Sequence, residues 1–286
     1  MCNEINKAVD ELIEAVRNSN EEEVVRLLEE EEVDIDERGS KGYTALHEAI
    51  SMEGYEMVEL LCYHGADPSQ SLASGLNSFH VAASADPIGD IMSNLVSAGD
   101  GSEDKDSQGR TPLHISADYD DFCDAMIVLL DSGVDLDVQD NQGRTPMHYA
   151  ADREDTYPPY DIFDYFKKNE EVSIIKLVEL SKESTIYALV LLIEYGADLN
   201  SRDAMGKTPL HYALTRWSFG NILMLVMNGA DVNIKDRFGM SAYEYACHNW
   251  GTEYADMFLK KDNLEKSDLK ISKQMFHEFW DRFTTI

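Results

Sequence analysis

Histidines recur at a nearly constant spacing along this sequence of 286 residues. Imidazole binds zinc and exchanges protons near neutral pH, so a metal centre or a general base is the first chemistry to consider. Five histidines end a four-residue phrase whose most regular form is Thr-Pro-Leu-His: His47, His80, His114, His148 and His211. They are 33, 34, 34 and 63 residues apart, and Glu48 beside His47 is not part of a His-Glu-x-x-His motif. The spacing therefore argues against metal-dependent hydrolysis.

Other arrangements that carry chemistry are missing from the sequence. It contains no glycine-rich phosphate loop and no Gly-x-Ser-x-Gly turn for a nucleophile. Asp135, Asp137 and Asp140 are spaced like calcium ligands, but the glycine and glutamate of an EF-hand loop are absent, so we expect turn residues. Carboxylates are so numerous that any acid and base pair would be unspecific. We expect a protein that is not an enzyme and uses no cofactor or metal.

Cysteine usage and hydropathy favour a cytoplasmic protein. The four cysteines are widely separated and show no Cys-x-x-Cys spacing, which argues against a zinc site or a disulfide framework. The first residues lack the apolar core of a signal peptide, and no run approaches the ~20 apolar residues of a membrane span. The prediction is a soluble cytoplasmic monomer with no membrane partner, while secretion by a route without a signal peptide stays open.

Acidic residues dominate the charge. The chain has 55 Asp and Glu against 24 Lys and Arg, a formal net charge of −31. Such a chain repels nucleic acids and anionic membranes and favours a protein partner, preferably a basic one. Residues 1–38 hold 14 acids and 4 bases and residues 86–140 hold 14 and 2, whereas residues 252–286 hold 7 and 6. The acidic half is either a solubilising surface or one that steers a basic protein toward the chain.

The period of about 33 residues predicts a stack of small supersecondary units. The copy at residues 203–233 shows the unit most clearly. Its opening Asp and Gly suit a tight turn, and Thr208 before Pro209 suits a helix start with threonine as the N-cap. The apolar run at residues 222–227 predicts a second helix, and Gly229 suits a left-handed end to it. Each unit should therefore consist of a turn, a helix, a turn and a helix.

This pattern resembles the ankyrin repeat family. A second phrase, Leu-Leu followed by Gly-Ala-Asp, recurs with the first, as at residues 60–67 and 191–198. The resemblance covers residues 5–260 and implies an all-α solenoid of stacked helix-turn-helix units with β-hairpin-like finger loops. It also implies that the repeated histidine holds hydrogen bonds between repeats. Seven repeats are expected, the first as a cap: 5–39, 40–72, 73–105, 106–139, 140–202, 203–235 and 236–260.

Three segments depart from the regular repeat. Repeat three should have a loose finger, because Ser78 replaces the proline and its tail is rich in glycine. His148 and Gly196 are 48 residues apart instead of 18, which predicts a helical insert at 152–186, opposite the fingers in the family's geometry. Residues 261–286 should form a helix that either caps the stack or docks a partner. Its apolar stripe is Met275, Phe276, Phe279, Trp280 and Phe283.

The resemblance also implies where a partner binds. In the ankyrin family, partners usually dock on the finger tips and the first turns of the inner helices, which form the concave face. Carried onto this sequence, these positions are Tyr43, Met52, Gln108, Arg110, Asp118, Tyr119, Gln142, Arg144, Asp152, Arg153, Met205, Lys207, Arg216, Trp217, Arg237, Phe238, Met240, Asn249 and Trp250. Aromatic, methionine and arginine side chains are typical of binding hot spots, and they concentrate from Tyr119 to Trp250. Alternatively, Trp217 and Trp250 only fill the groove or contact the next repeat.

Three functions fit these observations. The first is a non-catalytic adaptor, a protein–protein interaction module that binds a protein through its concave face. The second is an acidic inhibitor, either an immunity protein or a nucleic-acid mimic, that neutralises a basic toxin, nuclease or DNA-binding protein. The third is a substrate receptor whose C-terminal helix recruits ubiquitin machinery, although no F-box or SOCS-box phrase supports it.

Overall fold

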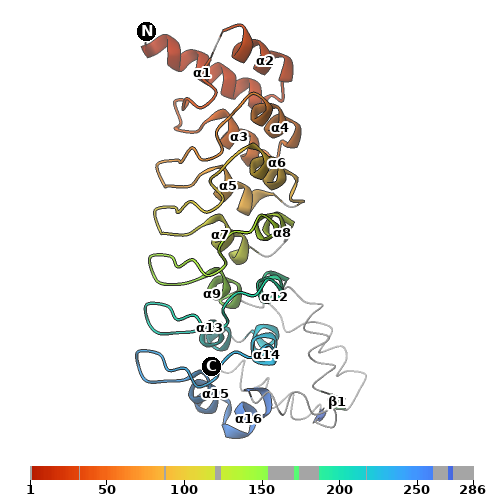
Figure 1. The fold of residues 1–286 in the computed structure, drawn as a ribbon, viewed down its shortest axis with the longest axis vertical. Helices are drawn as coiled ribbons and strands as arrows, with labels where there is room; N and C mark the ends of the chain where they lie inside the picture. Colours follow the sequence, from red (N-terminus) through yellow and green to blue (C-terminus); the bar gives the residue numbers. More distant parts are fainter. Residues whose placement is uncertain are drawn as a thin grey trace. The chain divides into compact units, whose positions relative to one another are not determined.

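The chain forms two compact units. The structure, a computed structural model, describes residues 2–31, 33–86, 88–119, 124–153, 171–173, 187–216, 218–259 and 270–272. Unit 1 is Met1–Asp135 and unit 2 is Leu136–Ile286. Within each unit, the repeats place their loops, called fingers, on the same side of the helices (Figure 1).

Unit 1 has two rows of helices. Its helices are α1 (Cys2–Arg17), α2 (Glu21–Glu29), α3 (Ala45–Ser51), α4 (Tyr55–Tyr63), α5 (Ser78–Ala85), α6 (Asp90–Ala98), α7 (Pro112–Asp118) and α8 (Asp124–Asp131). The inner row is α3, α5 and α7, in which neighbours pack against each other, and the outer row is α4, α6 and α8. Helix α1 packs against α3 and against α2, so the first repeat covers the start of the inner row.

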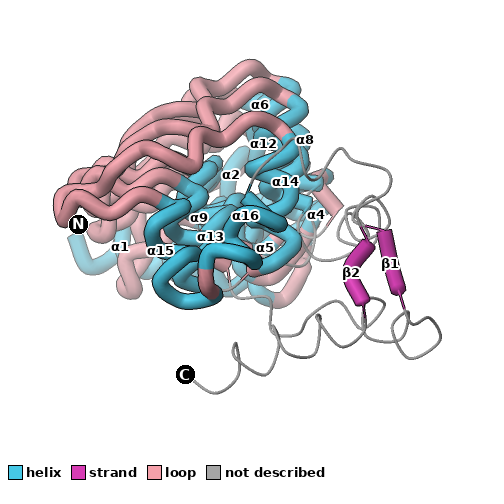
Figure 2. The backbone as a smooth tube through the Cα atoms, turned by 90° about the horizontal axis from the view of Figure 1, so that it is seen from below, coloured by secondary structure: helices cyan, strands magenta, loops and turns pink. Residues whose placement is uncertain are grey.

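Unit 2 continues the same pattern with shorter helices at its start. Its elements are α9 (Pro146–Ala151), β1 (Glu171–Ser173), α12 (Tyr187–Glu194), α13 (Pro209–Arg216), α14 (Phe219–Met227), α15 (Ala242–Trp250), α16 (Thr252–Leu259) and β2 (Lys270–Ser272). Helix α13 packs against α9 and α15 in the inner row, and α14 packs against α16 in the outer row. Figure 2 shows the loops along one side of these helices. We number each finger by its repeat, so finger 2 precedes α3 and fingers 3 to 7 precede α5, α7, α9, α13 and α15.

The inner helices begin as the sequence predicts. Thr111 and Thr145 have extended backbones and act as N-caps, with proline at the start of the helix. The histidine three residues later completes a capping box, since its side chain accepts a hydrogen bond from the backbone N–H of the cap residue. Asn77 plays the same part in repeat three, where the proline is absent. Threonine and histidine together therefore fix where each inner helix starts.

Most outer helices end at a left-handed glycine, also as predicted. Gly65, Gly133, Gly196 and Gly229 have φ between 84° and 98°, a conformation that side chains with a Cβ rarely adopt. Repeat three differs, because Gly99 follows α6 with an extended backbone, φ 172°. This difference falls in the repeat that the sequence marks as irregular.

The core lies between the inner and outer rows of each unit. The apolar residue before each histidine is at most 1% exposed: Leu46, Phe79, Leu113, Met147 and Leu210. The matching leucine of the outer helix is fully buried: Leu61, Leu95, Leu129, Leu192 and Leu225. Each repeat thus contributes at least two large side chains to a shared core, and burial of each stabilises the fold by about 1.5–3 kcal/mol.

The insert and the C-terminal segment contain a contact that the sequence does not suggest. Strand β1 pairs antiparallel with β2, with Val172 opposite Ile271. Between Arg153 and Tyr187 the structure describes only residues 171–173. After Leu259 it describes only residues 270–272. The helices expected within 152–186 and 261–286 lie outside the described residues and stay predictions.

Candidate functional site

Three of the repeated histidines join their inner helix to the next finger. His148 Nδ1 accepts a hydrogen bond from the backbone N–H of Thr145 at 3.1 Å, so the proton sits on Nε2. Nε2 then donates to the carbonyl of Lys207 at 3.1 Å. The same link joins His80 to the carbonyl of Arg110 at 2.9 Å and His211 to that of Met240 at 3.3 Å. The inter-repeat role implied by the resemblance is confirmed for these three histidines.

Burial keeps these histidines neutral. It lowers the pKa of His80, His148 and His211 below the ordinary value of 6.5. Burial lowers the pKa of His47 to about 4. Its buried Nε2 makes no hydrogen bond among the described residues, although the backbone of Leu76 still acts on its pKa. No group of three possible metal ligands occurs in the parts of the chain that the structure describes.

An aspartate closes each of fingers 4 to 7. In finger 5, Asp140 Oδ1 accepts backbone hydrogen bonds from Gln142 at 2.7 Å and from Arg144 at 2.9 Å. The equivalent aspartates hold their fingers in the same way: Asp106, Asp203 and Asp236. All four are at most 8% exposed. These carboxylates therefore fix the shape of the finger and contribute little to its surface.

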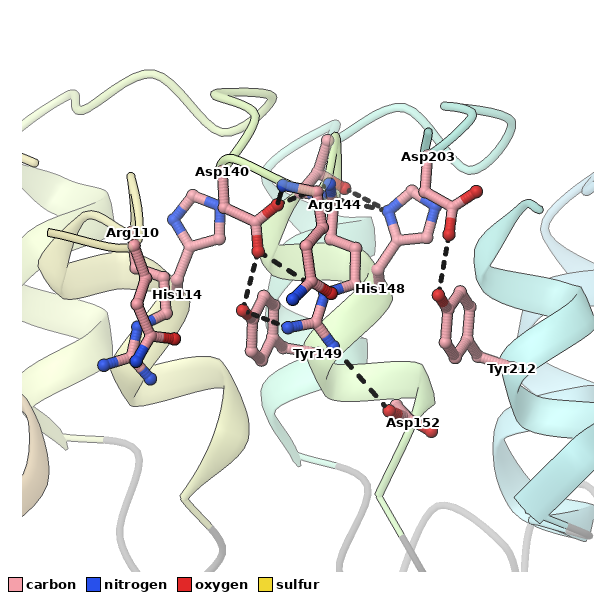
Figure 3. Close-up of polar contacts among 12 residues, drawn as sticks. Arg110, His114, Asp140, Arg144, His148, Tyr149, Asp152, Asp203 and Tyr212 are labelled. Carbon is pink, nitrogen blue, oxygen red and sulfur yellow. Dashed lines mark hydrogen bonds and ion pairs between the residues drawn. The ribbon is translucent and has the colours of Figure 1, made fainter. Parts of the chain in front are cut away.

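In unit 2 a tyrosine from the inner helix binds each of these aspartates. The hydroxyls of Tyr149 and Tyr212 donate to the second oxygen of Asp140 and Asp203, both at 2.7 Å (Figure 3). Tyr245 lies 3.5 Å from Asp236 in the same arrangement. Burial alone would raise the pKa of Asp140, but the hydrogen bonds from Tyr149 and the backbone, with the charge of Arg144, lower it. The aspartate stays ionised while it holds the finger.

Arg144 links finger 5 to the ends of two inner helices. Its guanidinium lies 4.1 Å from the ring centre of Tyr149, and its Nη2 donates to the Tyr149 hydroxyl at 2.5 Å. Its Nη1 lies 4.0 Å from Asp152, whose other oxygen accepts a bond of 2.7 Å from Arg216 Nε. Figure 3 shows Arg144 between Asp140 and Asp152. Finger 5, α9 and α13 are thus joined by one polar network.

Backbone hydrogen bonds connect the tips of neighbouring fingers. In unit 2, the N–H of Ala204 donates to the carbonyl of Gln142, and that of Arg237 donates to the carbonyl of Met205, both at 2.8 Å. In unit 1, Ser107 donates to Ser74 at 3.1 Å. The tips of fingers 5, 6 and 7 therefore form one continuous surface.

The expected partner-binding residues differ in exposure. The exposed ones are Tyr43, Met52, Gln108, Asp118, Tyr119, Gln142, Met205, Arg216, Arg237 and Phe238. The half-buried ones are Arg110, Arg144, Asp152, Arg153, Lys207, Met240 and Asn249. Trp217 and the side chain of Trp250 lie outside the described residues, so their expected contribution stays a prediction.

The structure brings part of this set together. Arg144, Asp152 and Arg216 meet in one ion-pair network, and Met205 and Arg237 meet through the bond between finger tips. Arg110 instead pairs with Asp106 of its own finger at 2.8 Å. Its half-buried side chain therefore helps to hold finger 4.

Sequence reasoning missed the tyrosines that brace the fingers. Each is nine residues after its aspartate and directly follows the histidine position, or its equivalent Glu244 in repeat seven: Tyr149, Tyr212 and Tyr245. The corresponding residues in unit 1 are Glu48, Val81 and Ile115. A comparison of repeats at this single position could have separated the two groups of fingers.

Two cavities lie away from the chemistry of the histidines. One, of about 300 Å³, lies between outer helices α12 and α14 and is lined by Tyr187, Ile193, Met224 and Met227. The other, of about 240 Å³, lies between α1 and finger 2. None of the helices in the described parts of the chain has the length and apolar character needed to cross a membrane.

Known proteins share this repeat. A model of three ankyrin repeats matches residues 4–71 and 79–174, and a model of one ankyrin repeat matches residues 205–237. The chain is 32% identical to protein phosphatase 1 regulatory subunit 27 of Mus musculus over 100 residues, 35% of this chain and 64% of that protein. It is 37% identical to the Notch-regulated ankyrin repeat-containing protein of Xenopus laevis over 73 residues, 24% of this chain and 64% of that protein. The match covers just under two thirds of each relative.

Solved structures agree on the fold. The ankyrin repeat domain of Bcl-3, titled a unique member of the IkappaB protein family, superposes with a TM-score of 0.64 at 23% identity. That match covers 82% of this chain and 92% of the Bcl-3 chain. The ankyrin repeat protein EF0377 gives a TM-score of 0.58 at 22% identity, covering 74% and 94%. The expected all-α ankyrin fold is confirmed, and the chain belongs to the ankyrin repeat family.

Proposed function

We propose that this chain is a non-catalytic adaptor that binds a protein partner through the fingers and inner helices of unit 2. Ankyrin repeats are protein–protein interaction modules, and one relative is named a regulatory subunit. The observation that carries the proposal is the braced set of fingers 5 to 7, which holds exposed Met205 and Phe238 on a fixed frame. A surface that is already ordered loses less conformational entropy when it binds.

The side chains on this frame suit a binding hot spot. Phe238 is 71% exposed and Met205 is 41% exposed. Arg237 is exposed next to Phe238, and Arg216 is exposed at the end of helix α13. Aromatic, methionine and arginine residues are enriched at the centres of interfaces, where they supply most of the binding energy. The fixed fingers therefore support a role in recognition and not only in folding.

Affinity capture from native extract with matched variants tests this proposal. We expect Met205→Ala with Phe238→Ala to lose the captured protein, because both side chains lie at the proposed contact. Tyr63→Ala is the control, since Tyr63 is 84% exposed but lies at the end of outer helix α4. If the double variant still binds the captured protein as tightly as the unaltered chain does, the proposal is wrong.

The charge of unit 1 favours a second candidate, an acidic inhibitor of a basic protein. Residues 1–135 hold 31 Asp and Glu against 7 Lys and Arg, while residues 136–286 hold 24 against 17. On the outer helices, Glu56, Glu59 and Asp90 belong to this acidic surface. An inhibitor of this kind should lose its association rate steeply as salt rises. Binding that depends on unit 1 and on salt would favour the inhibitor over the adaptor.

A further inference from the structure

We propose that the finger face of unit 2 recognises an acidic segment of its partner, one that also carries an apolar side chain. This inference rests on the proposed function and specifies the chemistry of the partner. The surface is the basic ridge, which we define as Arg202, Met205, Lys207, Arg237 and Phe238. It differs in charge from the chain as a whole, whose net charge of −31 favours a basic partner.

The two aspartates that close these fingers are withdrawn from the surface. Asp203 is 8% exposed and Asp236 is 5% exposed. Asp203 accepts two backbone hydrogen bonds at 2.8 Å and one from the Tyr212 hydroxyl at 2.7 Å. Asp236 accepts backbone bonds at 2.8 and 3.0 Å. Their oxygens accept hydrogen bonds inside the fingers, and in the described residues these carboxylates form no ion pair with the basic side chains at the tips.

The basic side chains of the ridge lack a carboxylate partner in the described residues; Arg202 and Arg237 are exposed, and Lys207 is half-buried. Arg202 donates to the carbonyl of Lys235 at 2.9 Å, which leaves its charge uncompensated. Lys207 Nζ lies 5.5 Å from the ring centre of Tyr212. Within the described residues, neither of them nor Arg237 has a carboxylate oxygen within 4.0 Å. Three positive charges are therefore available to a ligand.

In finger 4, the basic residue equivalent to Lys207 is paired inside its own finger and is not available to a ligand. Arg110 occupies the position equivalent to Lys207, directly before the N-cap, and it pairs with Asp106 at 2.8 Å. The two fingers also differ at the tyrosine position. Tyr212 occupies the second oxygen of Asp203, whereas repeat four has Ile115 at the tyrosine position and Arg110 takes that oxygen of Asp106. In finger 5, Arg144 Nε still lies 3.4 Å from Asp140 although Tyr149 binds the same carboxylate oxygen, so the tyrosine alone does not decide the pairing. Lys207 is the basic residue at this position that forms no such pair in the described residues.

Apolar side chains complete the ridge. The bond between the Arg237 N–H and the Met205 carbonyl holds the tips of fingers 6 and 7 together. Phe238 follows Arg237 and is 71% exposed. A ligand that places carboxylates near Arg202, Lys207 and Arg237 can therefore bury an aliphatic or aromatic side chain against Met205 and Phe238. A protein segment has both groups, whereas the negative charge of the rest of the chain repels a long nucleic acid.

Panning a random peptide library against the full chain tests the inference. We expect the enriched peptides to be acidic and to contain an aliphatic or aromatic residue. Lys207→Glu with Arg237→Glu should weaken the binding of an enriched peptide at least about tenfold, measured by fluorescence anisotropy at low salt. Lys7→Glu with Lys41→Glu is the matched control, because it makes the same change in net charge within unit 1. It should leave the affinity nearly unchanged.

The outcomes separate this inference from the function on which it rests. Neutral or basic peptides that still require Met205 and Phe238 would overturn the acidic partner but leave binding at the finger face intact. Two results would overturn both the inference and the proposed function. One is that the enriched peptides bind the charge variant and Met205→Ala with Phe238→Ala as tightly as the unaltered chain, and the other is that no peptide is enriched. A single-stranded oligonucleotide that displaces the peptide with equal affinity would also overturn the inference, because the ridge would then select negative charge alone.

Discussion

Fingers 2 and 3 of unit 1 and fingers 5 to 7 of unit 2 reach a similar shape by different means. Fingers 5 to 7 each contain their own aspartate, which binds the backbone of the finger and a tyrosine of the following helix. The same position holds Gly39 in finger 2 and Leu72 in finger 3. In finger 3, backbone bonds close the loop, with Leu72 N–H 2.7 Å from the Leu76 carbonyl. The fingers of unit 2 therefore have an additional brace.

In finger 2, side chains of helix α1 lie where the side chain of an aspartate would begin. A Cβ at Gly39 would lie 2.4 Å from Ile13 Cδ1 and 2.8 Å from Asp10 Oδ1 of helix α1. Asp10 replaces the missing carboxylate, since its Oδ1 accepts the backbone N–H of Ser40 at 2.8 Å. Glu48, at the tyrosine position in α3, accepts a hydrogen bond of 2.6 Å from Arg17 of helix α1. The comparison shows that helix α1 braces finger 2, whereas fingers 4 to 7 are braced by their own aspartates.

Removing the brace of finger 5 should have the largest effect. Asp140→Ala leaves Arg144 and Tyr149 without their partner and frees two backbone N–H groups. Loss of one member of a buried charged network costs about 3–5 kcal/mol. We expect that decrease in the free energy of unfolding by urea denaturation. Asp118→Ala, at an exposed position of α7, should change it by less than about 0.5 kcal/mol. Similar losses for the two variants would refute the brace.

The second largest effect is expected from acid, which should destabilise the junction between repeats two and three through His47. His47 has a pKa of about 4 in the fold and 6.5 when exposed. Unfolded chains therefore bind its proton first as pH falls, and stability decreases between pH 6.5 and 4. The shift corresponds to about 3 kcal/mol. His80, His148 and His211 change stability in the same direction, since their pKa values are also lowered.

Unfolding by urea across this pH range measures the effect. His47→Gln should flatten the dependence on pH, while His248→Gln, at an exposed position of α15, should not. If the profile of His47→Gln parallels that of the unaltered chain, the junction between repeats two and three is not the acid-sensitive one.

A smaller effect is expected from the hydroxyl of Tyr212. Tyr212→Phe keeps the ring but removes the donor to Asp203, so one buried carboxylate oxygen loses its partner. The expected cost is about 1–2 kcal/mol, visible in thermal unfolding. The same variant should speed hydrogen exchange of the backbone N–H groups of Met205 and Lys207, because both donate to Asp203. Tyr43→Phe at an exposed position of finger 2 is the control, and an equal loss there would contradict the comparison.

The smallest effect should come from Asp10. Asp10→Asn weakens one hydrogen bond at a half-buried position, to Ser40 in finger 2. We expect about 0.5–1 kcal/mol in urea unfolding and faster amide exchange at Ser40, with fingers 5 to 7 unaffected. Faster exchange at Gln142 or Met205 would mean that the two groups of fingers are not braced separately.

Features that repeat could be predicted, and features that occur once could not. The capping threonines and the left-handed glycines follow from local spacing, because each depends on residues a few positions apart. The histidine links were implied by the family resemblance. The pairing of β1 with β2 depends on residues about a hundred positions apart with no periodic signal, so no local rule suggests it. The tyrosine braces were visible in the sequence, but only as a difference between repeats at one position.

The sequence does not show which of the expected binding residues already has a partner inside its own finger. The family's geometry places Lys207 and Arg110 at equivalent positions, yet Arg110 pairs with Asp106 and Lys207 does not pair with Asp203. The two repeats also differ at the tyrosine position, Tyr212 against Ile115, and pairwise spacing does not show which basic residue is paired. Net charge also does not show where the charges lie: Asp106, Asp140, Asp203 and Asp236 count toward it although they are buried.

The histidine link across the insertion has a consequence for how such a chain can grow. His148 reaches a carbonyl 59 residues ahead at 3.1 Å, and His80 reaches one 30 residues ahead at 2.9 Å. The joint between repeats five and six thus has the usual geometry despite the longer connection. Doubling a flexible loop costs only about 0.6 kcal/mol in closure entropy. The connection between α9 and α12 is therefore a natural place to add or exchange a whole module without disturbing recognition.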